Sequence, residues 1–163
     1  FRAVFPHASL WLTRSYAVML ATPERLHIDI EQLNSRLRET AVARQLQEVF
    51  LGDAVSLLST LALGEAGLAA YAGTGPTNTD DRPYISFSER KRKGTSRGMP
   101  ALRSVSVHLS PTIVPYLDGV DAETAKQLDR RFEARRHMFL GVVALVQEKW
   151  GAAVKQLRRA LLI

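Results

Sequence analysis

The order of apolar and polar residues predicts a pair of strands near the start of the chain. Residues 7–13 and 15–22 are short apolar runs separated by Arg14. Short apolar runs with a polar break between them are typical of neighbouring strands. Pro23 and Glu24 close the second run. We therefore expect a compact hairpin here.

After this hairpin, the apolar residues take the spacing of helices. Asp29 precedes apolar residues that recur every three or four positions and leave the charges on the opposite side: Ile30, Leu33, Leu37 and Val42. Asp53 is a favourable N-cap for a second helical region, which carries Val55, Leu57, Leu58, Leu61 and Leu63. After Gly64 a shorter turn carries Leu68 and Tyr71, and the run 72–76 ends it. The sequence thus predicts helices through 29–73.

A further strand and a helical half are expected in the rest of the chain. Between 82 and 88, Ile85 and Phe87 alternate with other residues, which is the period of a strand with one buried face. This strand is expected to complete the sheet begun at residue 7. The second half is expected to be all helical, because its apolar residues keep helical spacing on both sides of two prolines, and Asp121 opens the longer stretch. These residues are Leu102, Val105 and Leu109, then Leu128, Phe132 and Leu140.

The composition of the chain excludes several kinds of functional site. The chain has 163 residues, of which 46% are hydrophobic and 23% charged, which suits one core or two small ones. It has no cysteine, and this excludes a disulfide framework, a thiolate metal site and a cysteine nucleophile. The histidines show no metal-ligand spacing, and each is interpreted as a packing or surface residue: His7, His27, His108 and His137. No metal site is therefore expected.

The net charge of +6 comes largely from the basic run 90–93. Glycines, Thr95, Ser96 and Pro100 surround this run, so we interpret 90–100 as a flexible linker between two folding units. A patch for nucleic acid or an anionic membrane surface is the alternative. Nucleic acid is the less favoured partner, because the run has no aromatic, Asn or Gln side chains to read bases.

No membrane span is expected either. The most apolar window, 54–72, is broken by Glu65 and by glycines, and it falls short of the roughly 20 apolar residues that a span needs. We expect a cytoplasmic location. The chain begins in an apolar run and ends on Leu161, Leu162 and Ile163, so it is expected to be a piece of a longer parent protein. Whether that parent is attached to a membrane stays open.

The run 78–83, Asn-Thr-Asp-Asp-Arg-Pro, carries the candidate site. Asp80 and Asp81 are two adjacent carboxylates that can hold a cation or an amine, and Arg82 can orient them through its planar guanidinium. The alternative is a capped turn that enters a strand, because Asn and Asp bond their own backbone in turns and Pro83 suits the first residue of a strand. Both interpretations stay open.

Residues 150–160 resemble the second helix of a tetratricopeptide repeat, and Leu140 and Gly141 match the leucine and glycine of its first helix. His137 stands where Trp is usual and Ala144 where Tyr is usual, and the small, large and small positions of the second helix are Ala153, Leu157 and Ala160. The resemblance implies a helical, repeat-like segment over 101–163. Since one repeat cannot bury its own face, it also implies further repeats downstream. An unrelated helical hairpin is the alternative.

Residues 5–11 and 78–83 resemble the C-terminal end of the spermidine synthase-like proteins. The resemblance covers residues 1–89 and implies a mixed α/β fold, namely the C-terminal part of a Rossmann-like methyltransferase sheet with inserted helices. It also implies a parent that transfers an aminopropyl group from decarboxylated S-adenosylmethionine to a polyamine. Asp80, Asp81 and Arg82 would then face the polyamine, whose positive charges paired carboxylates attract; a structural pair between Asp81 and Arg82 is the alternative.

The motifs of catalysis are absent from this sequence. It contains no Gly-x-Gly-x-Gly loop for the nucleoside, and it lacks the acidic segment that deprotonates the attacking amine in the family. We therefore expect no cofactor site here and no activity from these residues alone, whatever the parent does. The alternative function is a helical-repeat scaffold that binds a protein partner.

Overall fold

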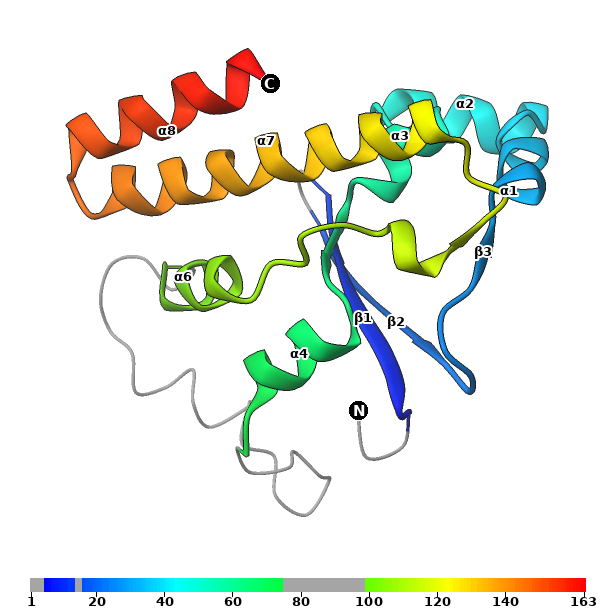
Figure 1. Ribbon diagram of the computed structural model, residues 1–163, viewed down its shortest axis with the longest axis horizontal. Coiled ribbons are helices and arrows are strands. Elements are labelled where there is room, and N and C mark those ends of the chain that lie inside the picture. The colour runs from blue at the N-terminus through cyan, green and yellow to red at the C-terminus, as the bar shows by residue number, and fades with distance from the viewer. Residues whose placement is uncertain (1–4, 14–15, 75–98) are drawn as a thin grey trace.

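The computed structural model describes residues 5–13, 16–74 and 99–163, and it shows a mixed α/β fold (Figure 1). Strands β1 (His7–Leu12) and β2 (Ala17–Thr22) pair antiparallel, with His7 opposite Thr22 and Leu12 opposite Ala17. The predicted hairpin is confirmed. The third strand of the sheet is β4 (Leu61–Leu63), and the order is β2-β1-β4.

Strand β4 corrects the prediction of a continuous helix through Leu61 and Leu63. Helix α3 (Ala54–Leu58) is capped by Asp53 as predicted, but it ends at Leu58. The hydroxyls of Ser59 and Thr60 donate to the carbonyl oxygens three residues back, at 2.8 and 2.7 Å. Such bonds compete with the helical ladder. The next residues are then free to pair with β1, where β4 is fully buried.

The first predicted helix is also interrupted. Helix α1 (Ile30–Leu37) begins after Asp29, whose Oδ1 accepts from the N–H of Gln32 at 2.9 Å, so the predicted N-cap is confirmed. The chain then leaves the helical path at Glu39, and a second helix, α2 (Thr40–Glu48), follows with no buried residue. Helix α4 (Glu65–Ala72) forms after Gly64, where the sequence predicted a shorter helical turn.

The second half is mainly, but not entirely, helical. It contains α6 (Met99–Val107), a 3-10 turn (Val114–Tyr116), α7 (Ala122–Val146) and α8 (Trp150–Leu162). Between the 3-10 turn and α7, strand β5 (Leu117–Asp118) pairs parallel with β3 (Ile28–Asp29). The expectation of an all-helical second half was therefore wrong at β5, where long-range pairing outweighs local propensity.

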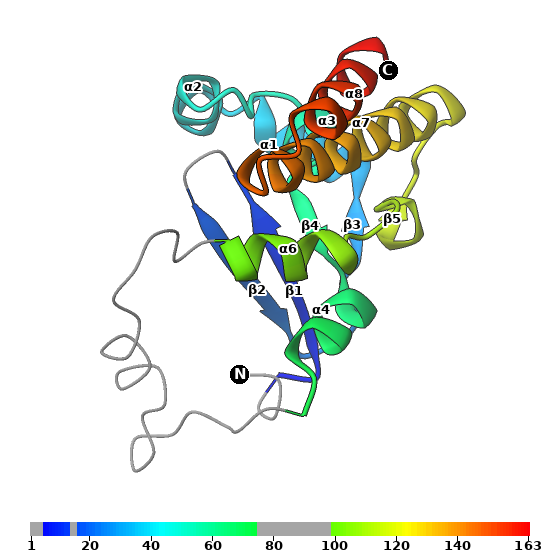
Figure 2. The same cartoon turned by 90° about the vertical axis from the view of Figure 1, so that its left-hand side faces the viewer.

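Two clusters of buried side chains lie on opposite faces of the sheet. Leu10 and Leu12 pack against the cluster that includes Leu68 of α4 and Val105 of α6. Trp11, which points to the other face, packs against a cluster built from α1, α3 and α7. Helices therefore cover both faces of the sheet (Figure 2).

The second cluster draws on both halves of the chain. Its buried members are Ile30, Leu37, Ala54, Leu58, Leu61, Ile113, Leu128 and Phe132. Residues before and after the predicted linker 90–100 thus share one core. Residues 90–98 lie outside the described part of the chain, and α6 begins at Met99.

Helices α7 and α8 form the long antiparallel hairpin seen at the top of Figure 1. Asp121 caps α7 as predicted, accepting from the N–H groups of Glu123 and Thr124 at 2.9 Å. The two helices approach closely at Gly141, where a Cβ atom would stand 2.7 Å from Cγ of Leu157. Ala153 is only 1% exposed. A helical hairpin is therefore confirmed for this segment.

Candidate functional site

The residues singled out from the sequence, Asp80, Asp81 and Arg82, lie outside the described residues, as does the strand expected over 82–88. Their assignment as a polyamine site or as a structural turn stays a prediction. Described structure stops at Thr74, just after α4, and resumes at α6.

The described residues do form a groove of about 790 Å³ between the α7–α8 hairpin and the segment that joins α2 to α3. Its walls are mostly apolar and its charged lining residues are Arg131 and Arg135; the others include Val49, Phe50, Leu51, Met138, Leu157 and Leu161. No Asp, Glu or His of the described residues lines it. The groove is therefore suited to an apolar or anionic ligand and lacks an acid–base pair for catalysis.

Arg135 is the most constrained charged side chain in this groove. Its Nη1 donates to the carbonyl oxygens of Ser59 and Leu61, the latter at 3.0 Å, and its Nη2 donates to the carbonyl of Leu12 at 2.9 Å. Its guanidinium also lies 5.5 Å from the ring centre of Phe139. Burial lowers the pKa of Arg135 to about 10, still high enough for it to stay charged at neutral pH.

These contacts give Arg135 a structural role. Leu12 ends β1, and Ser59 and Leu61 flank the turn into β4, so one guanidinium joins α7 to two strands of the sheet. Sequence reasoning missed this residue among the neighbouring arginines 130, 131 and 136. A usable signal was present: Arg135 lies on the apolar stripe of α7, at helical spacing from Phe132 and Phe139, both of which are buried.

Phe50 occupies a strained position on the opposite wall. Its φ angle is 60° and its side chain is 78% exposed. A bulky residue in the left-handed region is uncommon because its Cβ crowds the backbone. Val49 and Leu161, 53% and 86% exposed, also line this groove. Its rim is therefore apolar and open.

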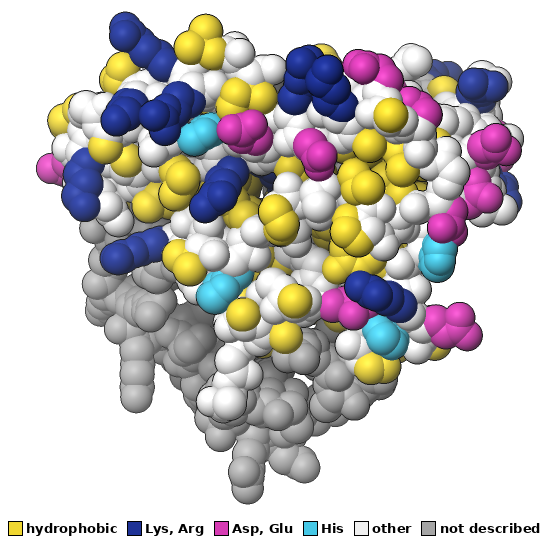
Figure 3. Space-filling model, in the orientation of Figure 1, with side chains coloured by type: hydrophobic (Ala, Val, Ile, Leu, Met, Phe, Trp, Pro, Cys, Tyr) yellow, Lys and Arg dark blue, Asp and Glu magenta, His cyan; other side chains and the backbone are white. Residues whose placement is uncertain are grey.

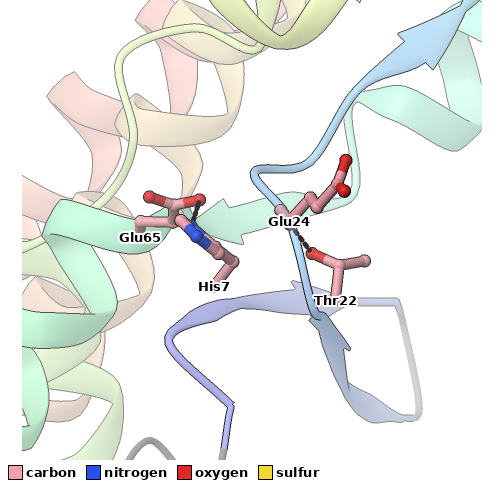
Figure 4. A network of polar contacts seen from close by, with 4 residues as sticks. All are labelled: His7, Thr22, Glu24 and Glu65. Atoms are coloured by element: carbon pink, nitrogen blue, oxygen red, sulfur yellow. Dashed lines mark hydrogen bonds and ion pairs between the residues drawn. The ribbon is translucent and has the colours of Figure 1, made fainter.

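A second polar contact fastens α4 to the sheet. Nδ1 of His7, at the start of β1, lies 2.9 Å from Oε1 of Glu65 in the first turn of α4 (Figure 4). Nearby, the Thr22 hydroxyl donates to the carbonyl oxygen of Glu24 at 2.6 Å and closes the end of β2. His7 thus links the start of β1 to the first turn of α4.

Charge is unevenly distributed over the surface. Lys and Arg side chains are most frequent over the α7–α8 hairpin, whereas Asp and Glu gather toward the α1 and α2 side (Figure 3). Within residues 5–13, 16–74 and 99–163, no group of three or more His, Asp or Glu side chains is placed to hold a metal ion. Over the same ranges no helix is both long and apolar enough to cross a bilayer.

Comparison with protein-family models, with curated proteins and with solved structures gave no match to this chain.

Proposed function

We propose that the chain is the C-terminal part of a spermidine synthase-like protein, and that a longer parent supplies the rest of the Rossmann-like sheet and the nucleoside site. The observation that carries this proposal is the antiparallel β1–β2 ladder, which lies at the edge of a sheet covered by helices on both faces. The resemblance of 5–11 implies an antiparallel end of the family sheet at this position.

In this proposal the polyamine is held by Asp80 and Asp81, with Arg82 beside them. The groove beside α7 is a poor alternative for the amine, because Arg131 and Arg135 would repel a dication such as putrescine. Its lining also offers no carboxylate among the described residues. The lining of the groove thus argues against it as the amine site, and the acidic run 78–83 stays the proposed site.

The decisive experiment uses the full-length parent with decarboxylated S-adenosylmethionine and putrescine, and measures spermidine by mass spectrometry. We expect spermidine from the parent, and a double variant Asp80→Asn, Asp81→Asn is expected to lose roughly tenfold or more in kcat/KM for putrescine. The matched control is Glu31→Gln, Glu48→Gln, which removes two exposed carboxylates elsewhere.

The outcomes separate the alternatives. If both folded double variants keep full activity, the acidic run is a structural turn. If the folded parent forms no spermidine with excess substrates, aminopropyl transfer is excluded and the helical-repeat scaffold becomes the better proposal.

The scaffold proposal has an observation of its own. Helix α8 packs tightly on α7 at Gly141, yet it leaves Val154, Leu161 and Leu162 at 50%, 86% and 86% exposure. Stacked repeats bury such a face against the next unit. Fusing one consensus tetratricopeptide repeat after Ile163 should raise the free energy of unfolding and give one cooperative transition. If the added repeat unfolded independently of the chain, the scaffold proposal would be contradicted.

A further inference from the structure

The groove between the α7–α8 hairpin and the segment that joins α2 to α3 has the size of a small-molecule site. Its volume is about 790 Å³, and ligand sites in proteins range over roughly 300–1,000 Å³. Such sites combine mostly apolar walls with a few polar groups that orient the ligand. The polar groups of this groove therefore indicate which ligand it fits.

The hydroxyl groups in the lining are already used within the chain. Each of them forms a hydrogen bond to a residue three positions away: Thr13, Ser56, Ser59 and Thr60. The remaining polar side chains of the lining are those of Arg131 and Arg135. A ligand in the groove would therefore meet two guanidinium groups and little other free polarity.

The positive charge of these arginines is not neutralised by a carboxylate in the groove. None of the ion pairs among the described residues includes Arg131 or Arg135. The charge of Arg131 helps to lower the pKa of Asp53, but Asp53 does not line this groove. A guanidinium has five N–H donors, and the described carbonyls accept three hydrogen bonds from Arg135. Both charge and donors therefore remain for an anion.

The apolar part of the lining is open to solvent. Phe50 and Leu161 are strongly exposed and Met138 is 44% exposed. Phe50 also keeps a left-handed backbone, with a φ angle of 60°, and strained positions of this kind gather at ligand sites. Covering these side chains with a hydrocarbon is favourable in proportion to the area removed from water. A small inorganic anion would leave them exposed.

We propose that this groove binds a fatty acid, with its carboxylate at Arg131 and Arg135 and its aliphatic chain against Phe50, Met138 and Leu161. The guanidinium groups supply charge-assisted hydrogen bonds to the carboxylate. The apolar wall supplies an affinity that grows with the length of the chain. This inference rests on the groove alone and holds whether or not the parent is an aminopropyltransferase.

The test is calorimetric titration of the whole chain with sodium decanoate below its micelle concentration. We expect one saturable site, with an affinity that rises roughly twofold or more for each methylene added between octanoate and dodecanoate. Decyltrimethylammonium carries the same aliphatic chain on a positive head group. It should bind roughly tenfold more weakly than decanoate, or not at all, because the two arginines repel it.

Two pairs of matched variants locate the site. Leu161 and Leu162 are both 86% exposed, but only Leu161 lines the groove. Leu161→Asp should therefore weaken decanoate binding roughly tenfold, and Leu162→Asp should leave it nearly unchanged. Arg131→Gln should weaken binding roughly fivefold or more, whereas Arg130→Gln removes an exposed arginine outside this lining and should have little effect. Circular dichroism checks that all four variants fold.

Three results would overturn the proposal. They are absence of a saturable decanoate site, equal affinity for decanoate and decyltrimethylammonium, and equal effects within either pair of variants. The occupant would be a second copy of the chain if light scattering showed a dimer that Leu161→Asp dissociates and decanoate did not bind.

Discussion

Replacing Arg135 by Met should destabilise the protein. Met retains much of the length and apolar contact of the side chain but removes the guanidinium. Three carbonyl groups, those of Leu12, Ser59 and Leu61, then lose their donor. The contact with the Phe139 ring is lost as well.

The magnitude follows from two opposing contributions. Hydrogen bonds to a charged group are worth about 1.5–3 kcal/mol each, so three give about 5–9 kcal/mol before any cost is considered. Burial of the guanidinium costs part of this, because a pKa lowered to about 10 corresponds to about 3 kcal/mol. Water can also reach some of the freed carbonyls. We therefore expect a net loss of about 2–4 kcal/mol in the free energy of unfolding.

The assay is urea unfolding followed by circular dichroism, with thermal unfolding as a second measure. A loss of this size lowers Tm by roughly 6–12 °C in a domain of this length. Arg136→Met is the matched control, because Arg136 is the adjacent arginine and is exposed, and it should change stability by less than about 0.5 kcal/mol. Arg135→Lys keeps the charge but cannot form the same fork, so it should recover only part of the stability. If Arg135→Met lost no more stability than Arg136→Met, the structural role assigned to Arg135 would be refuted.

Two glycines of the helical hairpin should respond in opposite ways to replacement by alanine. Gly141→Ala places a Cβ atom 2.7 Å from Cγ and 2.8 Å from Cδ2 of Leu157, and the overpacking should cost about 1–3 kcal/mol. Gly151→Ala meets nothing within 4 Å and should stabilise α8 by about 0.5–1 kcal/mol. Urea unfolding of both variants measures the two changes in stability, and equal effects would contradict the packing at Gly141. Asp53 gives a pH prediction: burial alone would raise its pKa, but hydrogen bonds from Ser56 and the charge of Arg131 outweigh burial and lower it. Its contribution should therefore be complete above its unfolded pKa and lost as pH falls through the lower folded value. Asp53→Ala should cost about 1 kcal/mol at pH 7 and progressively less as pH falls below the unfolded pKa, and a loss that does not change with pH would contradict this.

Local features of the fold were predictable because their causes are local. The β1–β2 hairpin follows from two apolar runs separated by a short polar break, and the helix starts at Asp29, Asp53 and Asp121 follow from side chains that accept N–H groups two or three residues ahead. The α7–α8 hairpin was likewise predictable from apolar spacing and from the small residues at its contact.

Two of the helices predicted from the sequence are strands in the structure, for the same physical reason. Leu61 and Leu63 keep helical spacing with the residues before them, yet they form β4 because β1 offers a ladder and the two helical layers offer full burial. In the same way Leu117–Asp118 joins β3, which is some ninety residues away in the sequence. Short apolar segments fit both the helical period and the strand period of two, and only long-range pairing decides between helix and strand.

The sequence by itself therefore determined the capped helix starts, the first hairpin, the long helical hairpin and the position of the acidic run at 78–83. The tertiary structure alone decided which short segments became strands, and which of several arginines was enclosed as the link between α7 and the sheet. The reason is that caps and amphipathic stripes depend on neighbours within a turn or two, whereas burial and strand pairing depend on residues brought together only when the whole chain folds.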